Sequence, residues 1–219
     1  MDWEAHAERE EDRYRDGLSR LPDDPDPRQK QLVRVAMAAG GAGLARLMQG
    51  RRGEAAGWLA RSAERYRESY EDAPPGSWGR LIGAIKSRVL AGDWEGAQED
   101  ARWALEQRPG ESGSPIGVYA AALASLTLGE DSQAGSLAAL LQNEPEEAFP
   151  RPVAEALAAL AAHERDAYAD AAARVLQSFD TRKAYLEDIP VADTALVLEA
   201  FAARRGIAAR PSSILLPEG

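Results

Sequence analysis

Hydrophobic residues recur along most of this chain at spacings of three and four, the pattern of helices that bury one face. Strict alternation of polar and apolar residues, which is typical of half-buried strands, is absent from the sequence. The clearest pair of helices is expected over 77–91 and 94–108, and the last helix over about 191–205. The pattern therefore predicts an all-α fold of about nine helices and no sheet.

Four alanines mark a repeated helix-turn-helix unit: Ala55, Ala97, Ala134 and Ala171, spaced 42, 37 and 37 residues apart. A turn residue stands five positions before each alanine, namely Gly50, Gly92, Gly129 or Asp166. A period of this length is typical of stacked helical hairpins, in which each unit buries its face against the next. We expect an αα superhelix.

Prolines and charges divide the chain into three parts. Residues 1–20 are predicted to form a charged N-terminal helix or docking arm, and Trp3 and Tyr14 favour its packing on the body. The segment LPDDPDP, residues 21–27, is expected to be a Pro-rich linker, because three prolines in seven residues are incompatible with a helix interior. Residues 28–219 are predicted to be one helical-repeat domain.

The formal charge of −10 narrows the classes of partner. An acidic surface repels phosphate backbones and anionic lipid headgroups, so we expect neither nucleic acid nor membrane as a partner. Such a surface attracts basic proteins, although acidity also serves solubility alone. The N-terminus is too charged for a signal peptide, and no apolar run approaches the ~20 residues of a membrane span. These features, and the lack of cysteine, favour the cytoplasm.

Candidate chemistry is sparse. His6 stands four residues before Glu10, which suggests half of a metal site, but two ligands do not make a site. His163 is expected at the end of a helix in a structural role. The glycines of residues 40–43 and the loop 110–114 complete neither a phosphate-binding motif nor a nucleophile elbow. We assign no catalytic, metal or cofactor-binding residue and no cofactor, and we predict that the protein is not an enzyme.

Tryptophan is the other residue type that suggests function. Two of the five tryptophans, Trp94 and Trp103, belong to the clearest pair of helices, where an exposed aromatic side chain would be a natural centre of a protein interface. The alternative is that the tryptophans only pack the core. Sequence alone does not identify the partner-binding residues, and the oligomeric state stays open.

The segment 81–109 resembles a tetratricopeptide repeat. The turn Gly92-Asp93-Trp94 matches that family, as do the small residues Ala97 and Ala104 and the terminal Pro109. Ile85 and Arg88 depart from the family, which prefers a small residue and a tyrosine at those positions in the first helix. The resemblance implies a tetratricopeptide-like scaffold that binds a peptide or protein.

The C-terminal third resembles the immunity 49 family, all-α proteins of bacterial polymorphic-toxin systems. The resemblance rests on Tyr168-Ala169-Asp170-Ala171, Arg182-Lys183-Ala184-Tyr185, the helix 197–202, Arg205-Gly206-Ile207 and the tail Leu215-Leu216-Pro217. The tail lacks the acidic and aromatic character of that family. Membership would imply a stoichiometric inhibitor that binds and blocks a toxin without catalysis.

The leading functional hypothesis is therefore a non-enzymatic protein-binding module, in one version an immunity protein that meets a basic toxin domain. The alternative is a general tetratricopeptide-like scaffold that binds a peptide or host protein in its groove. A third hypothesis is a regulator that holds an apolar small molecule inside a helical superhelix.

Overall fold

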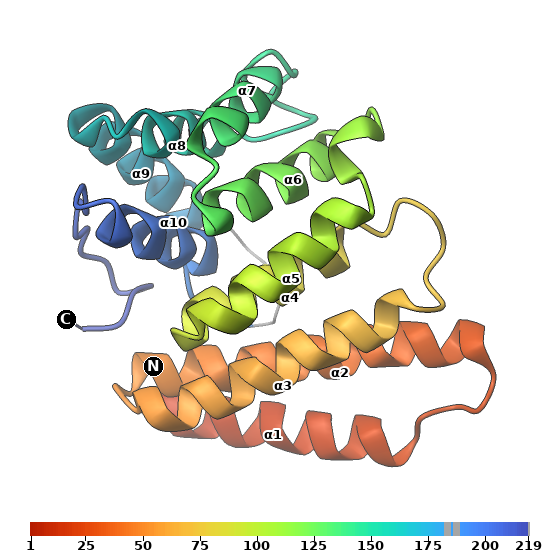
Figure 1. Cartoon of the computed structure of the whole chain (residues 1–219). Coiled ribbons are helices and arrows are strands. Elements are labelled where there is room, and N and C mark those ends of the chain that lie inside the picture. The colour runs from red at the N-terminus through yellow and green to blue at the C-terminus, as the bar shows by residue number, and fades with distance from the viewer. Residues whose placement is uncertain (182–184, 186–188, 219) are drawn as a thin grey trace. The chain divides into compact units, whose positions relative to one another are not determined.

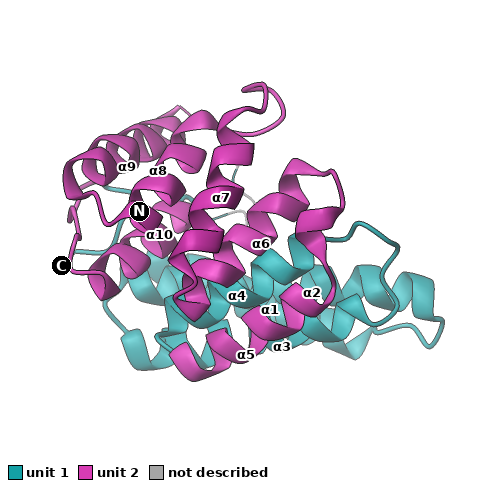
Figure 2. Ribbon diagram, turned by 45° about the horizontal axis from the view of Figure 1, so that its top comes forward, with its two compact units in different colours: residues 1–93, 183–191, 214–219 teal, residues 94–182, 192–213 magenta. Residues whose placement is uncertain are grey.

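The computed structural model describes residues 1–181, 185 and 189–218. Within these residues it contains ten α-helices, one short 3-10 helix and no strand (Figure 1). The predicted all-α fold class is confirmed. The chain divides into two compact units (Figure 2): unit 1 comprises 1–93 with the described parts of 183–191 and 214–219, and unit 2 comprises the described parts of 94–182 with 192–213.

Unit 1 is built from four helices in chain order: α1 (Trp3–Ser19), α2 (Pro25–Met48), α3 (Arg52–Tyr70) and α4 (Gly79–Ala91). Each helix packs against the next. Their shared core consists of almost fully buried apolar side chains, including Leu32, Val35, Leu59, Leu81 and Ile85. The N-terminal helix is part of this packing, because the ring of Tyr14 meets that of Trp58 edge-on at 5.3 Å between centroids.

Helix α2 begins at Pro25, inside the segment 21–27 that was expected to be a linker and before the predicted start of the helical-repeat domain at residue 28. Asp24 precedes the helix, and its side chain accepts a hydrogen bond from the Asp26 amide at 3.4 Å. The first turn of a helix has N–H groups without intrahelical partners, so proline costs little there. The three prolines therefore mark a helix start as well as a chain bend.

The glycines of residues 40–43 lie within the continuous helix α2. A Cβ atom built on Gly43 would lie 2.6 Å from Cγ of Leu59 in α3, closer than real side chains approach. Gly43 thus serves close helix packing, and the helix continues without a break through residues 40–43.

Unit 2 contains the remaining elements: α5 (Trp94–Glu106), the 3-10 helix η1 (Pro109–Glu111), α6 (Pro115–Leu128), α7 (Asp131–Gln142), α8 (Arg151–Ala162), α9 (Arg165–Asp180) and α10 (Asp193–Arg204). Each helix from α5 to α9 packs against the next, and α10 contacts α8 and α9. Helix α6 is buried on all sides from Gly117 to Thr127. Its sequence explains this, because apolar residues occupy every face of the helix.

The repeat register differs from the prediction in its fourth unit. Ala55, Ala97 and Ala134 are fully buried, and each is the fourth residue of its helix. In α9 the fourth residue is Tyr168, not Ala171, and the turn residue five positions earlier is His163, not Asp166. His163 has φ of 56°, in the left-handed region that Gly50, Gly92 and Gly129 occupy in the other units. The last spacing is therefore 34 residues and not 37.

The segment that resembles a tetratricopeptide repeat forms helices α4 and α5. Gly92 ends α4 in the left-handed conformation, and the amide of Asp93 donates to the carbonyl of Arg88 at 3.0 Å. The boundary between the two units falls directly after this turn, between Asp93 and Trp94. Across the described residues, no helix is both long enough and apolar enough to cross a membrane.

Candidate functional site

The acidic charge is distributed unevenly along the chain. Residues 1–93 contain sixteen acidic and sixteen basic residues, whereas residues 94–219 contain twenty acidic and ten basic. The whole formal charge of −10 thus arises in the part of the sequence that supplies nearly all of unit 2. A basic partner would be attracted to that unit in particular.

Two large apolar side chains of unit 2 are exposed at one end of the α6–α7 pair. Ile116, in the first turn of α6, is 42% exposed, and Leu140, in the last turn of α7, is 54% exposed. Gly129 and Glu130 form the short turn between these two packed helices, so the helices run antiparallel. The start of α6 and the end of α7 therefore lie at the same end of the pair.

The connection from α7 to α8 folds back toward this end. Phe149 is buried, and its ring lies 5.3 Å between centroids from that of Tyr119 in α6. Arg151 donates hydrogen bonds to the carbonyl oxygens of Gln142 and Glu144. These contacts hold the loop against the first half of α6 while Glu146 and Glu147 remain exposed.

We call Ile116, Leu140, Glu146 and Glu147 the α6–α7 patch. It combines apolar side chains with carboxylates on one end of a helix pair. Protein interfaces commonly have an apolar centre and a polar rim. A partner with an apolar side chain among lysines or arginines would complement both parts of the patch.

Helical periodicity in the sequence gives one signal for this patch. The buried residues of α7 form a stripe of Ala134, Leu137, Ala138 and Leu141. Leu140 lies off that stripe, so helical periodicity alone places a leucine on the open face. The position of Glu146 and Glu147 depends on the loop's fold, which periodicity does not predict.

The opposite end of the α6–α7 pair carries a polar cluster. His163 Nε2 lies 2.7 Å from Oδ2 of Asp131, and Arg205 binds the other oxygen of the same carboxylate. Arg205 also donates to the carbonyl of Leu126 at 2.9 Å. The cluster ties together α6, α7 and the segments after α8 and α10, in agreement with a structural role for His163.

A cavity of 680 Å³ lies beside this cluster, lined by Leu105, Ser125 and residues 129–133. The hydroxyl group of Ser125 is buried without a hydrogen-bond partner in the described part of the chain. The cavity is broad and mixed in character, and one of its two carboxylates, that of Asp131, binds Arg205. It offers no clear preference for one charge of ligand.

The suggested half-site of His6 and Glu10 is not built for a metal. Glu10 is fully buried, and its carboxylate accepts hydrogen bonds from Arg9 at 2.9 Å and from Arg13 at 2.8 Å. His6 stacks at a tilt on Trp3, 5.5 Å between ring centroids. Across residues 1–181, 185 and 189–218, no group of three or more His, Asp and Glu side chains is arranged to hold a metal ion.

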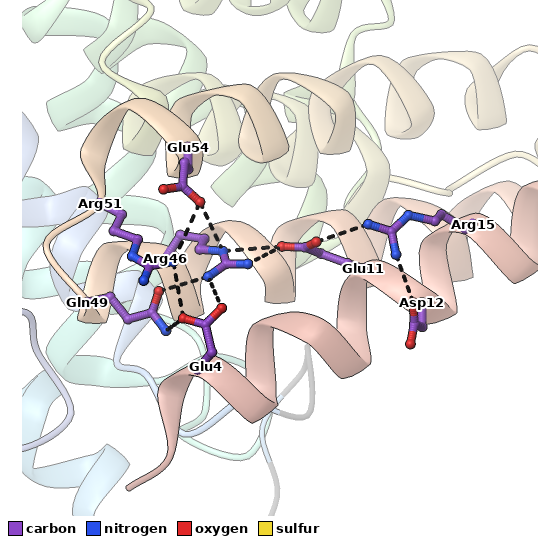
Figure 3. A network of polar contacts seen from close by, with 8 residues as sticks. All are labelled: Glu4, Glu11, Asp12, Arg15, Arg46, Gln49, Arg51 and Glu54. Atoms are coloured by element: carbon purple, nitrogen blue, oxygen red, sulfur yellow. Dashed lines mark hydrogen bonds and ion pairs between the residues drawn. The ribbon is translucent and has the colours of Figure 1, made fainter.

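A dense polar network in unit 1 centres on Arg46 (Figure 3). This side chain is 7% exposed and lies 2.7 Å from Glu4 and 2.7 Å from Glu11, both on α1. Burial alone would lower the pKa of Arg46, but hydrogen bonds to Glu4 and Glu11 outweigh it and raise that pKa. Arg46 therefore stays charged and fastens α1 to α2.

Tyr168 and Glu199 form a contact between α9 and α10 that sequence reasoning missed. The buried Tyr168 hydroxyl donates to Glu199 at 2.9 Å, and the same carboxylate accepts from the backbone amides of Ala209 and Arg210. Burial, and then the charge and hydrogen bond of Glu199, raise the pKa of Tyr168 far above its usual value. Both residues belong to the segments that resemble the immunity 49 family; Arg182, Lys183 and Ala184 lie outside the described residues.

All five tryptophans are half-buried. Trp94 packs on Phe201 at 5.9 Å between ring centroids, with the guanidinium of Arg204 4.3 Å from its ring centre. Trp58 packs on Tyr14, and the guanidinium of Arg61 lies 4.6 Å from the ring centre of Trp58. These contacts favour the packing interpretation for Trp58 and Trp94.

The fold and the patch together define an all-α protein of successive packed helices with an acidic C-terminal half. Comparison of the chain with protein-family models, with curated proteins and with solved structures finds no match.

Proposed function

We propose that this chain is a non-enzymatic protein-binding module, and that unit 2 binds a basic partner protein through the α6–α7 patch. The observation that carries the proposal is the excess of ten acidic residues within 94–219, against an even balance within 1–93. Such an excess speeds the encounter with a basic protein, and the exposed Leu140 supplies apolar contact area where the charges meet.

The specific version is an immunity protein that blocks a cognate bacterial toxin. Its support is the resemblance of the C-terminal third to the immunity 49 family, together with the acidic charge. In this version the toxin domain is basic at the surface that meets the patch. The complex is stoichiometric, and inhibition follows from occlusion.

The alternative is a general tetratricopeptide-like scaffold that binds a peptide or host protein. Its support is the repeat register, in which Ala97, Ala134 and Tyr168 occupy the fourth position of successive second helices. The spacing of 34 residues between the last two equals the usual period of that repeat, whereas the 37-residue spacing before it does not.

The test is co-expression and titration calorimetry with the product of the neighbouring open reading frame. We expect a one-to-one complex that weakens with added salt. The variant Glu146→Lys/Glu147→Lys should raise Kd by about tenfold or more, and Leu140→Ser should also weaken binding. The matched control is Glu8→Lys/Glu64→Lys, which makes the same change in net charge at two exposed positions of unit 1. It should change Kd by less than about threefold.

Failure of the neighbouring product to bind, or to be neutralised, refutes the immunity version. Equal losses in the patch variant and the control refute the patch as the binding site. Binding of several unrelated host proteins, each abolished by Leu140→Ser, supports the scaffold alternative.

A further inference from the structure

The cavity beside Leu105 and Ser125 in unit 2 contains the start of helix α7. Residues 129–133 supply the turn before this helix and the helix's first turn. The amide of Glu130 donates to the carbonyl of Ser125 at 2.9 Å, so this serine lies next to the first residues of α7. At 680 Å³ the cavity is large enough for a small ring with a polar substituent.

Ser125 carries a hydroxyl group that is not used by the fold. The side chain is fully buried in α6, and its Oγ has no hydrogen-bond partner within the described residues. A buried hydroxyl of a helix often donates to the carbonyl four residues earlier, as Thr127 of the same helix does to Leu123 at 2.7 Å. Leaving such a group unpaired costs free energy, so a bound group that pairs with it is favoured.

The first turn of α7 supplies further donors. The amides of residues 131–133 precede the first hydrogen bond of the helix, in which Ala134 donates to the carbonyl of Glu130 at 3.0 Å. Helices α1 and α2 are capped by the side chains of Asp2 and Asp24, but in the part of the chain that the structure describes no side chain caps α7. These N–H groups are therefore available to an acceptor in the cavity.

The charged groups around the cavity oppose ligands of either sign. The two oxygens of the Asp131 carboxylate are already engaged by Arg205 and His163. Glu130 is exposed and would repel an anion bound at the start of α7. A cation would be repelled by the N–H groups there, since a helix N-terminus carries partial positive charge. An uncharged group with both an acceptor and a donor avoids both penalties.

We propose that this cavity binds a carboxamide group. Its carbonyl oxygen accepts hydrogen bonds from the Ser125 hydroxyl and from the N–H groups of residues 131–133, and its own N–H donates to the Glu130 carboxylate. The dipole of the amide thus matches the positive helix start and the negative carboxylate. Leu105 packs against the apolar part of the ligand. The site lies within unit 2 and does not rest on the function proposed for the α6–α7 patch.

The experiment is a titration of the ¹⁵N-labelled full chain with benzamide, benzoate and benzamidinium, at neutral pH and constant ionic strength. These three probes have nearly the same shape and are neutral, anionic and cationic. We expect saturable shifts of the amide resonances of residues 131–133, with a Kd for benzamide of about 1–10 mM. Each charged probe should bind at least about threefold more weakly than benzamide.

Two pairs of variants locate the bound group. Ser125→Ala should raise the Kd of benzamide by about three- to tenfold, whereas Ser136→Ala, at an exposed serine of α7, should change it by less than about twofold. Glu130→Gln removes the repelling charge and should strengthen benzoate binding relative to benzamide by about threefold, but the control Glu147→Gln should not. Circular dichroism should show Ser125→Ala folded, because the lost hydroxyl has no partner within the described residues.

A titration with N-methylbenzamide distinguishes two sources of the carboxamide. Tighter binding of benzamide identifies a primary amide, as in asparagine or glutamine side chains, and equal or tighter binding of N-methylbenzamide identifies a peptide group. The proposal is overturned if a charged probe binds as tightly as benzamide, or if no probe gives saturable shifts at residues 131–133. It is also overturned if Ser125→Ala and Ser136→Ala have the same effect, because the buried hydroxyl would then take no part in binding.

Discussion

Replacing Arg46 with methionine removes the cation that fastens α1 to α2 in unit 1 (Figure 3). Methionine keeps much of the aliphatic stem of arginine, so the change tests the ion pairs more than the packing. The carboxylate left behind at Glu11 is 12% exposed and cannot recover full hydration. We therefore expect a substantial loss of stability in unit 1.

The expected loss of stability depends on the burial of Arg46 and Glu11. Removing one member of a buried ion pair costs about 3–5 kcal/mol, because the other charge is left without compensation. Glu11 retains Arg15 as a second partner at 3.1 Å, which lowers the cost. The side chains of Glu4 and Glu54 are 44% and 55% exposed, so water can solvate their carboxylates when Arg46 is lost. We expect Arg46→Met to reduce the free energy of unfolding by about 2–3 kcal/mol.

The assay combines urea denaturation of the full chain with hydrogen exchange. The amides of α1 should lose protection by the same free energy, because this helix depends most on the pair. A double-mutant cycle with Glu11→Gln should give a coupling of about 1–3 kcal/mol between the two positions. Arg52→Met is the control, since Arg52 is exposed, and should change stability by less than about 0.5 kcal/mol.

Two results would refute this reasoning. One is a loss below about 1 kcal/mol for Arg46→Met, which would mean that the network behaves as a surface ion pair. The other is strict additivity of Arg46→Met and Glu11→Gln, which would mean that the two side chains do not interact in solution.

Two further predictions concern unit 2. Gly117→Ala places a Cβ 2.4 Å from the carbonyl oxygen of Pro109, so it should lower the free energy of unfolding by about 1–3 kcal/mol in chemical denaturation. In the control Gly135→Ala the new Cβ makes only an ordinary contact at 3.6 Å. This control should raise the free energy of unfolding by about 0.5–1 kcal/mol. Equal effects of the two alanines would contradict the close packing of α6. The raised pKa of Tyr168 means that the folded state keeps its proton when the unfolded state loses one, so stability should fall above about pH 10 by up to about 1.4 kcal/mol per pH unit. Tyr168→Phe should remove that part of the slope, and parallel slopes for the two proteins would show that Tyr168 does not cause it.

Helix positions could be read from the sequence because glycine and proline mark many of the turns. Gly92 and Gly129 end α4 and α6 in the left-handed conformation, as their spacing predicted. The fourth repeat was misplaced because a histidine, His163, takes the same conformation there. Non-glycine residues rarely adopt it, so the pattern of turn residues favoured Ala171 in place of Tyr168 as the fourth anchor.

Contacts between distant residues could not be predicted in this way. Periodicity shows which face of a helix is buried, but not which residue of another helix it meets. Arg46 and Glu11 are separated by 35 residues, and Tyr168 and Glu199 by 31. The α6–α7 patch could not be predicted for the same reason, because it depends on a contact between distant residues. Glu146 and Glu147 are brought to the end of α6 only when Phe149 packs on Tyr119.

The net charge of −10 describes neither half of the chain correctly. Within 1–93 the charges balance, and many of the arginines of unit 1 are held in ion pairs such as those of Glu10 and Glu11. Within 94–219 ten basic residues cannot neutralise twenty acidic ones, whatever pairs they form. The acidic excess of 94–219 is therefore available to attract a basic protein. Added salt would weaken this attraction wherever on the chain it acts, so the matched variants Glu146→Lys/Glu147→Lys and Glu8→Lys/Glu64→Lys are needed to separate a local contact from general screening.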